Sequence, residues 1–215
     1  MTNILTKILK VLCQEDTMNA LRASEDRICV SEMKKDDLPF LHELWHTGEV
    51  MKYADEFPYF RGWSRTDDRE SAWKKYQEMR RIVGALYQQL IIRLKDGTRI
   101  GESFFAPPSG RKFIGRWKIP ENLICIVGDI KVLPQYWGRG LGTEGMRQVV
   151  KYAFSITDCD LFVVPPHKDN PAAQRVYEKA GFVQIVGKKG KNMMWAGHNL
   201  MKLTRKEFKT LCEDL

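Results

Sequence analysis

Apolar and polar residues alternate with a strand-like period in several short stretches of the chain. Residues 27–33 place Ile28 and Val30 on one face, as expected for a half-buried strand. Apolar runs on either side of Asp96-Gly97 predict a hairpin, because Asp-Gly suits a tight turn. The predicted strands are, in chain order, 27–33, 86–94, 99–105, 123–132, 161–164, 182–186 and 193–203.

Helical spacing of apolar residues appears between these strands. Asn170 can cap a helix whose first residue is Pro171, where a missing N–H costs nothing, and Gly181 suits its end. The predicted helices are, in chain order, 2–12, 36–46, 66–83, 144–154, one from Pro171 to the stop at Gly181, and 205–214. Strands and helices mixed in this way predict an α/β (α+β) fold.

The organisation predicted is one domain, residues 21–215, preceded by an amphipathic helical extension, residues 1–20. No Pro/Gly/Ser-rich linker divides the rest of the sequence. Lys7 and Lys10 interrupt the apolar face of the extension, and no small-residue cleavage site follows, which argues against a signal peptide. We expect this helix to pack either on the domain or on a second subunit of a homodimer.

Charge and cysteine usage narrow the classes of partner. The chain has 35 Lys and Arg against 27 Asp and Glu, a net charge of +8, which suits a ligand with several phosphates. Nucleic acid is not expected, because the basic clusters lack interleaved aromatics. The 5 cysteines and 4 histidines are scattered without zinc-ligand spacing, so no metal is predicted. Free thiols, and apolar runs too short to span a membrane, predict a cytoplasmic protein.

A glycine-rich segment joins the strand at 123–132 to the helix at 144–154. Backbone N–H groups in such a turn point at one spot at the positive end of a helix, where a pyrophosphate fits. Gly140-Leu-Gly142-Thr-Glu-Gly145 matches a dinucleotide motif, but Asp158 and Asp160 come before the next strand rather than at its end. The alternative pattern is Gln-x-x-Gly-x-Gly, counted from Gln135.

That alternative resembles the coenzyme A motif of the GCN5-related N-acetyltransferases, the GNAT superfamily. The segment from Asn170 to Phe182 resembles the second signature of the same superfamily. Both segments are most similar to the aminoglycoside 6′-N-acetyltransferases and the ribosomal-protein N-terminal acetyltransferases. The resemblance implies a mixed central sheet of about six to seven strands, splayed between the fourth and fifth and flanked by about four helices, with the N-terminal helix as an addition.

The resemblance also implies acetyl-CoA as cosubstrate. The pyrophosphate would lie on the glycine-rich loop, and the pantetheine arm would pair with the main chain of the splayed strand, as an added strand pairs with a sheet edge. The cofactor-binding residues implied are Ile130, Val132, Gln135, Gly138, Arg139, Gly140, Leu141, Gly142, Thr143 and Asn170.

Direct transfer to an amine needs a base, because an ammonium is no nucleophile. By resemblance, Asp129 is the first candidate, although a register shift of one residue would turn its side chain to the other face. Glu102 is the second candidate, and it could instead be a structural carboxylate. By resemblance, Tyr177 would protonate the departing thiolate; the alternative is a core aromatic. Cys125 is the weaker idea of a nucleophile, because no histidine stands near it.

The acceptor is expected beside an irregular aromatic stretch, residues 49–65. There Asp55 and Glu56 are candidates for meeting a cationic amine. The first hypothesis is therefore an N-acetyltransferase for a small amine of the aminoglycoside or polyamine kind. The alternatives are a protein or peptide N-terminal acetyltransferase, and a coenzyme A-binding sensor without turnover.

Overall fold

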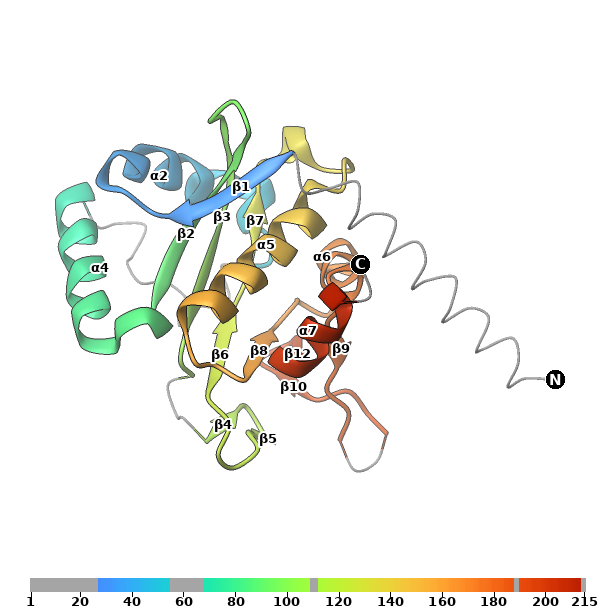
Figure 1. Ribbon diagram of the computed structural model, residues 1–215. Helices are drawn as coiled ribbons and strands as arrows, with labels where there is room; N and C mark the ends of the chain where they lie inside the picture. Colours follow the sequence, from blue (N-terminus) through green and yellow to red (C-terminus); the bar gives the residue numbers. More distant parts are fainter. Residues whose placement is uncertain (1–26, 55–67, 109–111, 188–189, 214–215) are drawn as a thin grey trace.

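The computed structural model describes residues 27–54, 68–108, 112–187 and 190–213. They form a central sheet with helices on both faces (Figure 1). The path of the sheet is β1 (Ile28–Glu32), β2 (Gln88–Leu94), β3 (Arg99–Ala106), β6 (Cys125–Gly128), β8 (Leu161–Val164), β12 (Met201–Thr204) and β9 (Val183–Gln184), and β7 (Lys131–Val132) pairs with β3. Two small hairpins stand apart: β4 (Phe113–Ile114) with β5 (Trp117–Lys118), and β10 (Met194–Trp195) with β11 (His198–Asn199).

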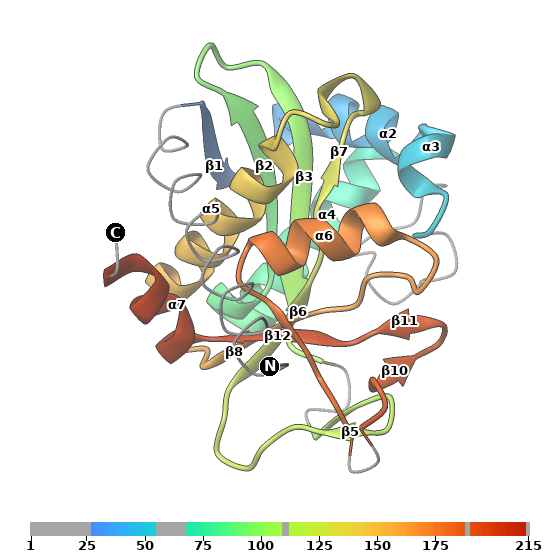
Figure 2. The same ribbon diagram turned by 90° about the vertical axis from the view of Figure 1, so that its right-hand side faces the viewer.

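The helices divide between the two faces of the sheet. Figure 2 shows α5 and α7 on one side and α2 and α3 on the other. The helices are α2 (Leu38–His46), α3 (Gly48–Met51), α4 (Arg69–Val83), α5 (Leu141–Ile156), α6 (Pro171–Lys179) and α7 (Arg205–Glu213). Short 3₁₀ turns at Lys35–Asp37, Gly84–Leu86 and Pro134–Tyr136 connect them to the strands. The predicted fold class is confirmed, including the mixed sheet with its parallel β6–β8 pair.

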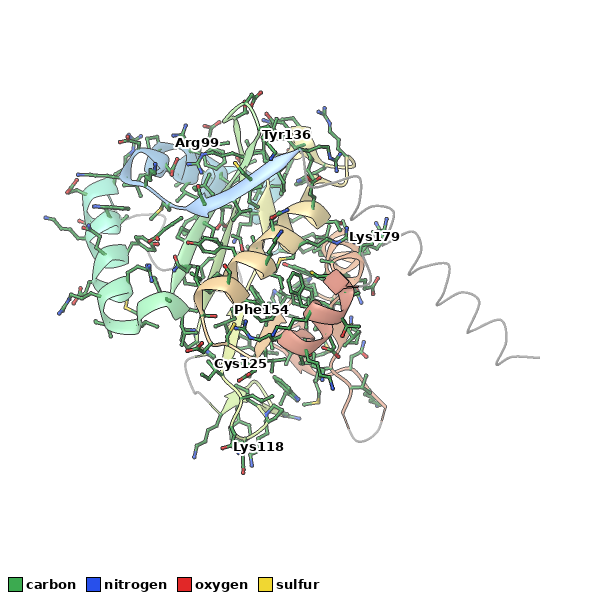
Figure 3. The ribbon with its side chains drawn as sticks, in the orientation of Figure 1. Arg99, Lys118, Cys125, Tyr136, Phe154 and Lys179 are labelled. Atoms are coloured by element: carbon green, nitrogen blue, oxygen red, sulfur yellow. The ribbon has the colours of Figure 1, made fainter. Side chains whose placement is uncertain are left out.

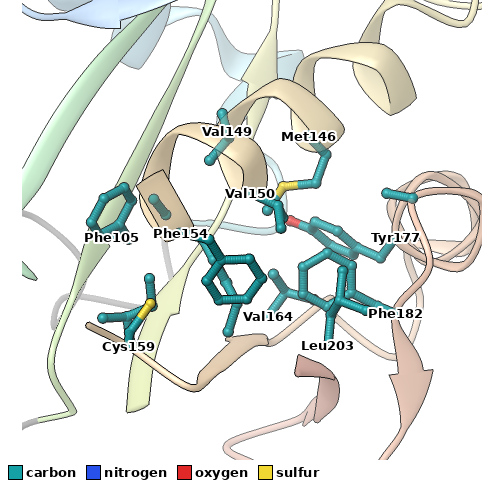
Figure 4. Close-up of a cluster of buried hydrophobic side chains, with 14 of the residues drawn as sticks. Phe105, Met146, Val149, Val150, Phe154, Cys159, Val164, Tyr177, Phe182 and Leu203 are labelled. Carbon is teal, nitrogen blue, oxygen red and sulfur yellow. The ribbon is translucent and has the colours of Figure 1, made fainter. Parts of the chain in front are cut away.

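Each face of the sheet has its own apolar core. The core under α5 includes Phe105, Phe154, Phe162 and Leu203, as well as the ring of Tyr177 (Figure 4). The core under α2 and α4 is lined by Leu41, Leu44, Trp45, Tyr76, Tyr87 and Phe104. Burying a large apolar side chain contributes about 1.5–3 kcal/mol, so these two layers hold the helices against the sheet.

Several predicted elements are confirmed. The turn of the β2–β3 hairpin has Gly97 at φ 90°, and the Thr98 N–H donates to Asp96 Oδ1 at 2.8 Å. Asn170 caps α6, where its Oδ1 accepts from the Ala173 N–H at 3.0 Å. Thr204 and Glu207 cap α7 reciprocally, each side chain accepting from the other's backbone N–H. Arg99 of β3 lies beside α2 (Figure 3), where it pairs with Asp37.

Two predicted strands are divided in the structure. The strand predicted over 123–132 is divided into β6 and β7 at Asp129 and Ile130, although the Asp129 N–H still donates to Phe104 O of β3. The strand predicted over 193–203 becomes β10, β11 and β12. Ala196 and Gly197 adopt φ angles of 45° and 80°, and this left-handed pair reverses the chain into a hairpin.

Two helix starts also differ from the prediction. The first helical residue of α4 is Arg69 rather than Thr66, because the Asp68 side chain accepts from the N–H groups of Glu70 and Ser71 as a cap. The first residue of α5 is Leu141, three residues before the predicted start. The predicted extension, residues 1–20, lies outside the described residues.

Candidate active site

The strand formed by β6 and β7 separates from β8 halfway along its length. The parallel pairing ends at Val127 and Val163, while β7 stays with β3. Asp129 N–H donates to Phe104 O at 3.1 Å and Leu133 N–H to Ile100 O at 2.9 Å. Along an antiparallel strand, every second residue forms main-chain hydrogen bonds to the neighbouring strand. The N–H and C=O groups of the alternate residues, Ile130 and Val132, therefore face away from β3 and into the gap. The sequence predicted this splay.

The glycine-rich loop lies at the outer end of the gap. Gly138 and Gly140 have φ angles of 72° and 77°, which residues with a Cβ rarely adopt, and Gly140 directly precedes α5. Arg27 fastens the loop: its Nη1 donates to Arg139 O at 3.1 Å and its Nη2 lies 2.6 Å from Glu144 Oε2. The first N–H groups of α5, which lack intrahelical partners, and the dipole of this 16-residue helix therefore meet where a pyrophosphate could bind. The other predicted loop residues, Gln135, Leu141, Gly142 and Thr143, lie in the same turn and the first turn of α5.

The indole of Trp137 reaches back from this loop to the strand. Its Nε1 donates to Val132 O at 2.6 Å, although half of the residue's surface is exposed. One of the two residues predicted to pair with a pantetheine arm thus already has a side-chain partner at its carbonyl. No motif in the sequence gave Trp137 a role.

Tyr177 lies at the inner end of the gap. It projects from α6, is only 3% exposed, and packs edge-to-face on Phe182 with ring centroids 5.8 Å apart. Burial, and next the carboxylate of Asp129, raise the pKa of Tyr177, while the nearby backbone N–H of Ile130 opposes the rise. The hydroxyl therefore keeps its proton at neutral pH and can act as a donor. Tyr177 is therefore a core aromatic, and its role as proton donor to a departing thiolate stays a prediction.

The two candidate bases, Asp129 and Glu102, share one buried ammonium. Lys131 Nζ lies 2.5 Å from Asp129 Oδ2 and 2.8 Å from Glu102 Oε1. Glu102 also accepts from Trp45 Nε1 at 3.2 Å and from Gln89 Nε2 at 2.5 Å. Both oxygens of Glu102 are thus engaged in hydrogen bonds, and the residue has 0% exposure.

The pKa shifts in this cluster follow from burial and charge. Burial raises the pKa of Glu102, against the lowering effect of the Lys131 ammonium. Burial opposes a charged Lys131, but the carboxylates of Asp129 and Glu102 outweigh it and raise the pKa of this lysine. Lys131 therefore stays an ammonium at neutral pH and remains a strong partner for both carboxylates.

A cavity opens in front of Asp129. Its lining includes Trp45, Met51, Tyr53, His167 and Tyr177 as well as Asp129, Ile130, Lys131 and Asn170. Asp129 Oδ1 is buried and has no hydrogen-bond partner among the residues that the structure describes. Of the two candidate bases, Asp129 lines this cavity, whereas Glu102 does not.

The far wall of the cavity contains stacked rings. His167, after the end of β8, stacks on Tyr53 with ring centroids 5.2 Å apart and meets His198 edge-to-face at 4.9 Å. No motif in the sequence singled out His167 or Lys131. Lys131 follows Asp129 by two residues on a strand, so alternation alone could have placed both on one face.

Other candidates can now be placed. Asp55 and Glu56 lie outside the described residues. Cys125 is buried, and burial raises the pKa of its thiol to about 12, as expected for an inert core cysteine. His42 and His46 stack on one another at 4.1 Å. In the described ranges no group of three or more His, Cys, Asp or Glu side chains could hold a metal ion. A bilayer-spanning helix is absent from the part of the chain that the structure describes.

Comparison with known proteins gives a consistent result. A family model described as an acetyltransferase (GNAT) domain matches residues 27–183. A spermidine N(1)-acetyltransferase of Vibrio cholerae serotype O1 is 21% identical over 161 residues, which are 74% of this chain and 80% of that relative.

Solved structures agree in fold. The aminoglycoside acetyltransferase AAC(6′)-Ib, in complex with ribostamycin and coenzyme A, matches with a TM-score of 0.63 and 21% identity over 86% of this chain and 97% of its own. The spermidine N-acetyltransferase from Vibrio cholerae, in complex with CoA and spermine, matches with a TM-score of 0.61 and 15% identity over 85% of this chain and 98% of its own.

Proposed function

The chain belongs to the GNAT acetyltransferase family, and from this premise we propose that it transfers the acetyl group of acetyl-CoA to a primary amine of a small cationic acceptor. The observation that supports this most strongly is the splayed gap itself. A glycine-rich helix start lies at one end of the gap, and a carboxylate oxygen without a partner among the described residues lies at the other.

The cofactor fits the residues that line the gap. The N–H groups of the Gly138–Gly140 turn would hold the pyrophosphate, and the main-chain groups of Ile130 and Val132 would pair with the amides of the arm. Acetyl-CoA supplies an activated acyl group as a thioester. The Val132 N–H, which faces the gap, is suited to stabilise negative charge on the acyl oxygen.

Asp129 and Tyr177 have complementary proton-transfer roles in this proposal. Asp129 Oδ1 accepts a proton from the acceptor amine, directly or through a water, which makes the nitrogen nucleophilic. The Tyr177 hydroxyl, whose pKa is raised mainly by burial, donates a proton to the sulfur that leaves. Glu102 does not contact the acceptor, because both of its oxygens are engaged behind the cavity.

The acceptor class is inferred from the cavity and the relatives. Two of the similar proteins are named for spermidine and for aminoglycosides, which are amines with several positive charges. In this chain the cavity combines the Asp129 carboxylate with the rings of Trp45, Tyr53 and His167. A carboxylate beside aromatic faces suits a primary ammonium on an otherwise compact molecule.

An acceptor panel tests this proposal. Free thiol release from acetyl-CoA would be followed with aminoglycosides, polyamines and short peptides as separate acceptors. We expect turnover with the first or second class and little with peptides. Turnover confined to peptides would move the assignment to N-terminal acetylation. Tight acetyl-CoA binding with no thiol release from any acceptor would contradict an enzymatic role and favour a sensor.

A further inference from the structure

The ammonium of Lys131 occupies a fixed place between two carboxylates. Its side chain is only 12% exposed, and it lies 2.8 Å from Glu102 Oε1 and 2.5 Å from Asp129 Oδ2. The second oxygen of Asp129 is buried and has no hydrogen-bond partner among the described residues, and Asp129 itself lines the cavity. One oxygen of the proposed base is thus held by Lys131, and the other has no partner in the described part of the chain.

We propose that Lys131 is a positioning residue for Asp129, and that Glu102 is the anchor that holds Lys131 in place. This inference rests on the proposed function, because it assigns Asp129 as the base. Lys131 fixes the rotation of the Asp129 carboxylate so that Oδ1 faces the amine.

The anchor is rigid because three elements meet at Glu102. Glu102 and Lys131 are direct cross-strand partners in the β3–β7 ladder, which places their side chains on one face. Gln89 of β2 and Trp45 of α2 donate to the Glu102 carboxylate from its other sides, at 2.5 and 3.2 Å. Lys131 therefore cannot leave without exposing a buried carboxylate to an apolar surrounding, which is costly.

The charges of the cluster are also suited to the acceptor. Two carboxylates and one ammonium leave a net charge of one negative unit, which one acceptor ammonium would balance. The titratable groups that face Asp129 are Lys131 and Glu102 from the sheet and Tyr177 from α6. His167 and His198 line the same cavity on its far wall.

The test compares Lys131→Met alone, Lys131→Met with Glu102→Gln, and Lys131→Arg. The double variant removes one positive and one negative charge together, so it should fold even if the single variant does not. Lys202→Met is the matched control, because Lys202 is another half-buried lysine on a strand of the same sheet. Thermal unfolding verifies that each variant is folded before kinetics are measured.

The readouts are kcat, the KM of the best amine, and the Kd of coenzyme A. We expect the double variant to lose kcat by about tenfold to a hundredfold, as for a misplaced catalytic group. The KM of the amine should change much less than kcat, because the Asp129 carboxylate is still present but is no longer held in one orientation. Coenzyme A affinity should not change. Lys131→Arg should restore most of kcat, because it restores a cation between the two carboxylates.

A purely structural lysine would change stability without lowering the kcat of a folded variant. A folded double variant with the wild-type kcat and KM would therefore overturn the positioning role. Absence of thiol release by the wild-type protein with every amine would overturn the proposed function and this inference together. Wild-type turnover with an unaffected double variant would overturn this inference alone.

Discussion

Asp37 holds the start of α2 to the β2–β3 hairpin, and its charge should contribute strongly to stability. The residue is 1% exposed, and its Oδ1 lies 2.6 Å from both Arg93 Nη2 and Arg99 Nε. Its Oδ2 accepts from the Lys34 N–H at 2.9 Å. Asp37→Asn keeps the shape of the side chain but leaves the two guanidinium groups without their counter-charge.

The expected cost follows from the exposure of the two arginines. Arg93 is 16% exposed, so its pair belongs to the buried class, in which removing one partner costs about 3–5 kcal/mol. Arg99 is 40% exposed and adds about 1 kcal/mol or less. We take about 3 kcal/mol as the expected loss, because water can reach the Arg99 side. That corresponds to a fall in Tm of about 6–12 °C for a domain of this size.

The pH dependence of this loss has a definite sign. Burial opposes ionisation of Asp37, but the hydrogen bonds from Lys34, Arg99 and Arg93 together lower its pKa. A carboxyl group whose pKa is lowered by folding stabilises the fold at pH values above its ordinary pKa of about 3.9. This stabilisation is lost as the pH falls through the lower pKa of the folded state. The Tm difference between wild type and Asp37→Asn should therefore be full at pH 7 and shrink below about pH 4.

The assay is thermal unfolding, followed by circular dichroism at pH 7 and at a pH below about 4. Asp36→Asn is the matched control: the same substitution at the exposed neighbouring residue should change stability by less than about 0.5 kcal/mol. Equal Tm values for wild type and Asp37→Asn at pH 7, or a difference that grows in acid, would refute this reasoning.

Three further predictions concern Arg205, Gly128 and Trp137. Arg205→Met should lower the free energy of unfolding by about 2–3 kcal/mol, measured by denaturant unfolding, because Arg205 donates to three carbonyls at and just beyond the end of α5. Lys206→Met, at an exposed neighbour, should be near neutral. Gly128→Ala should lower the free energy of unfolding by about 1–3 kcal/mol, because a Cβ there would lie 2.6 Å from a β3 carbonyl oxygen. Gly48→Ala is the control, because a Cβ at Gly48 meets nothing within 4 Å. Equal Tm values for the two variants would contradict this prediction. Coenzyme A should change the tryptophan fluorescence of the wild type but not of Trp137→Phe, because pantetheine pairing would displace that indole from its β7 carbonyl; the same spectral change in both proteins would disprove the displacement.

Local chemistry made much of the fold predictable from sequence. The Asp96-Gly97 turn and the Asn170 cap each depend on residues a few positions apart, and the structure has both. The division of 123–132 into β6 and β7 was not predictable in this way. It depends on which side of the strand β3 and β8 occupy, and that is a tertiary property.

In the candidate site, too, some features follow from short sequence motifs and others depend on tertiary contacts. The glycine-rich turn and Tyr177 follow from motifs within short segments. The choice between Asp129 and Glu102 needed the structure, because Trp45 and Gln89, far away in sequence, engage the Glu102 carboxylate. Lys131, whose ammonium joins the two carboxylates, could have been predicted from the sequence, because it shares a strand face with Asp129.

The most direct test of the proposed function compares Asp129→Asn with wild type, using the best amine of the acceptor panel. Thiol release gives kcat, and calorimetry gives the Kd of coenzyme A for both proteins. If Asp129 is the base, kcat should fall by about 10²–10⁴-fold while the Kd stays the same, because a positioned base contributes that much to proton transfer. An Asp129→Asn protein that binds coenzyme A and retains wild-type turnover would contradict the account.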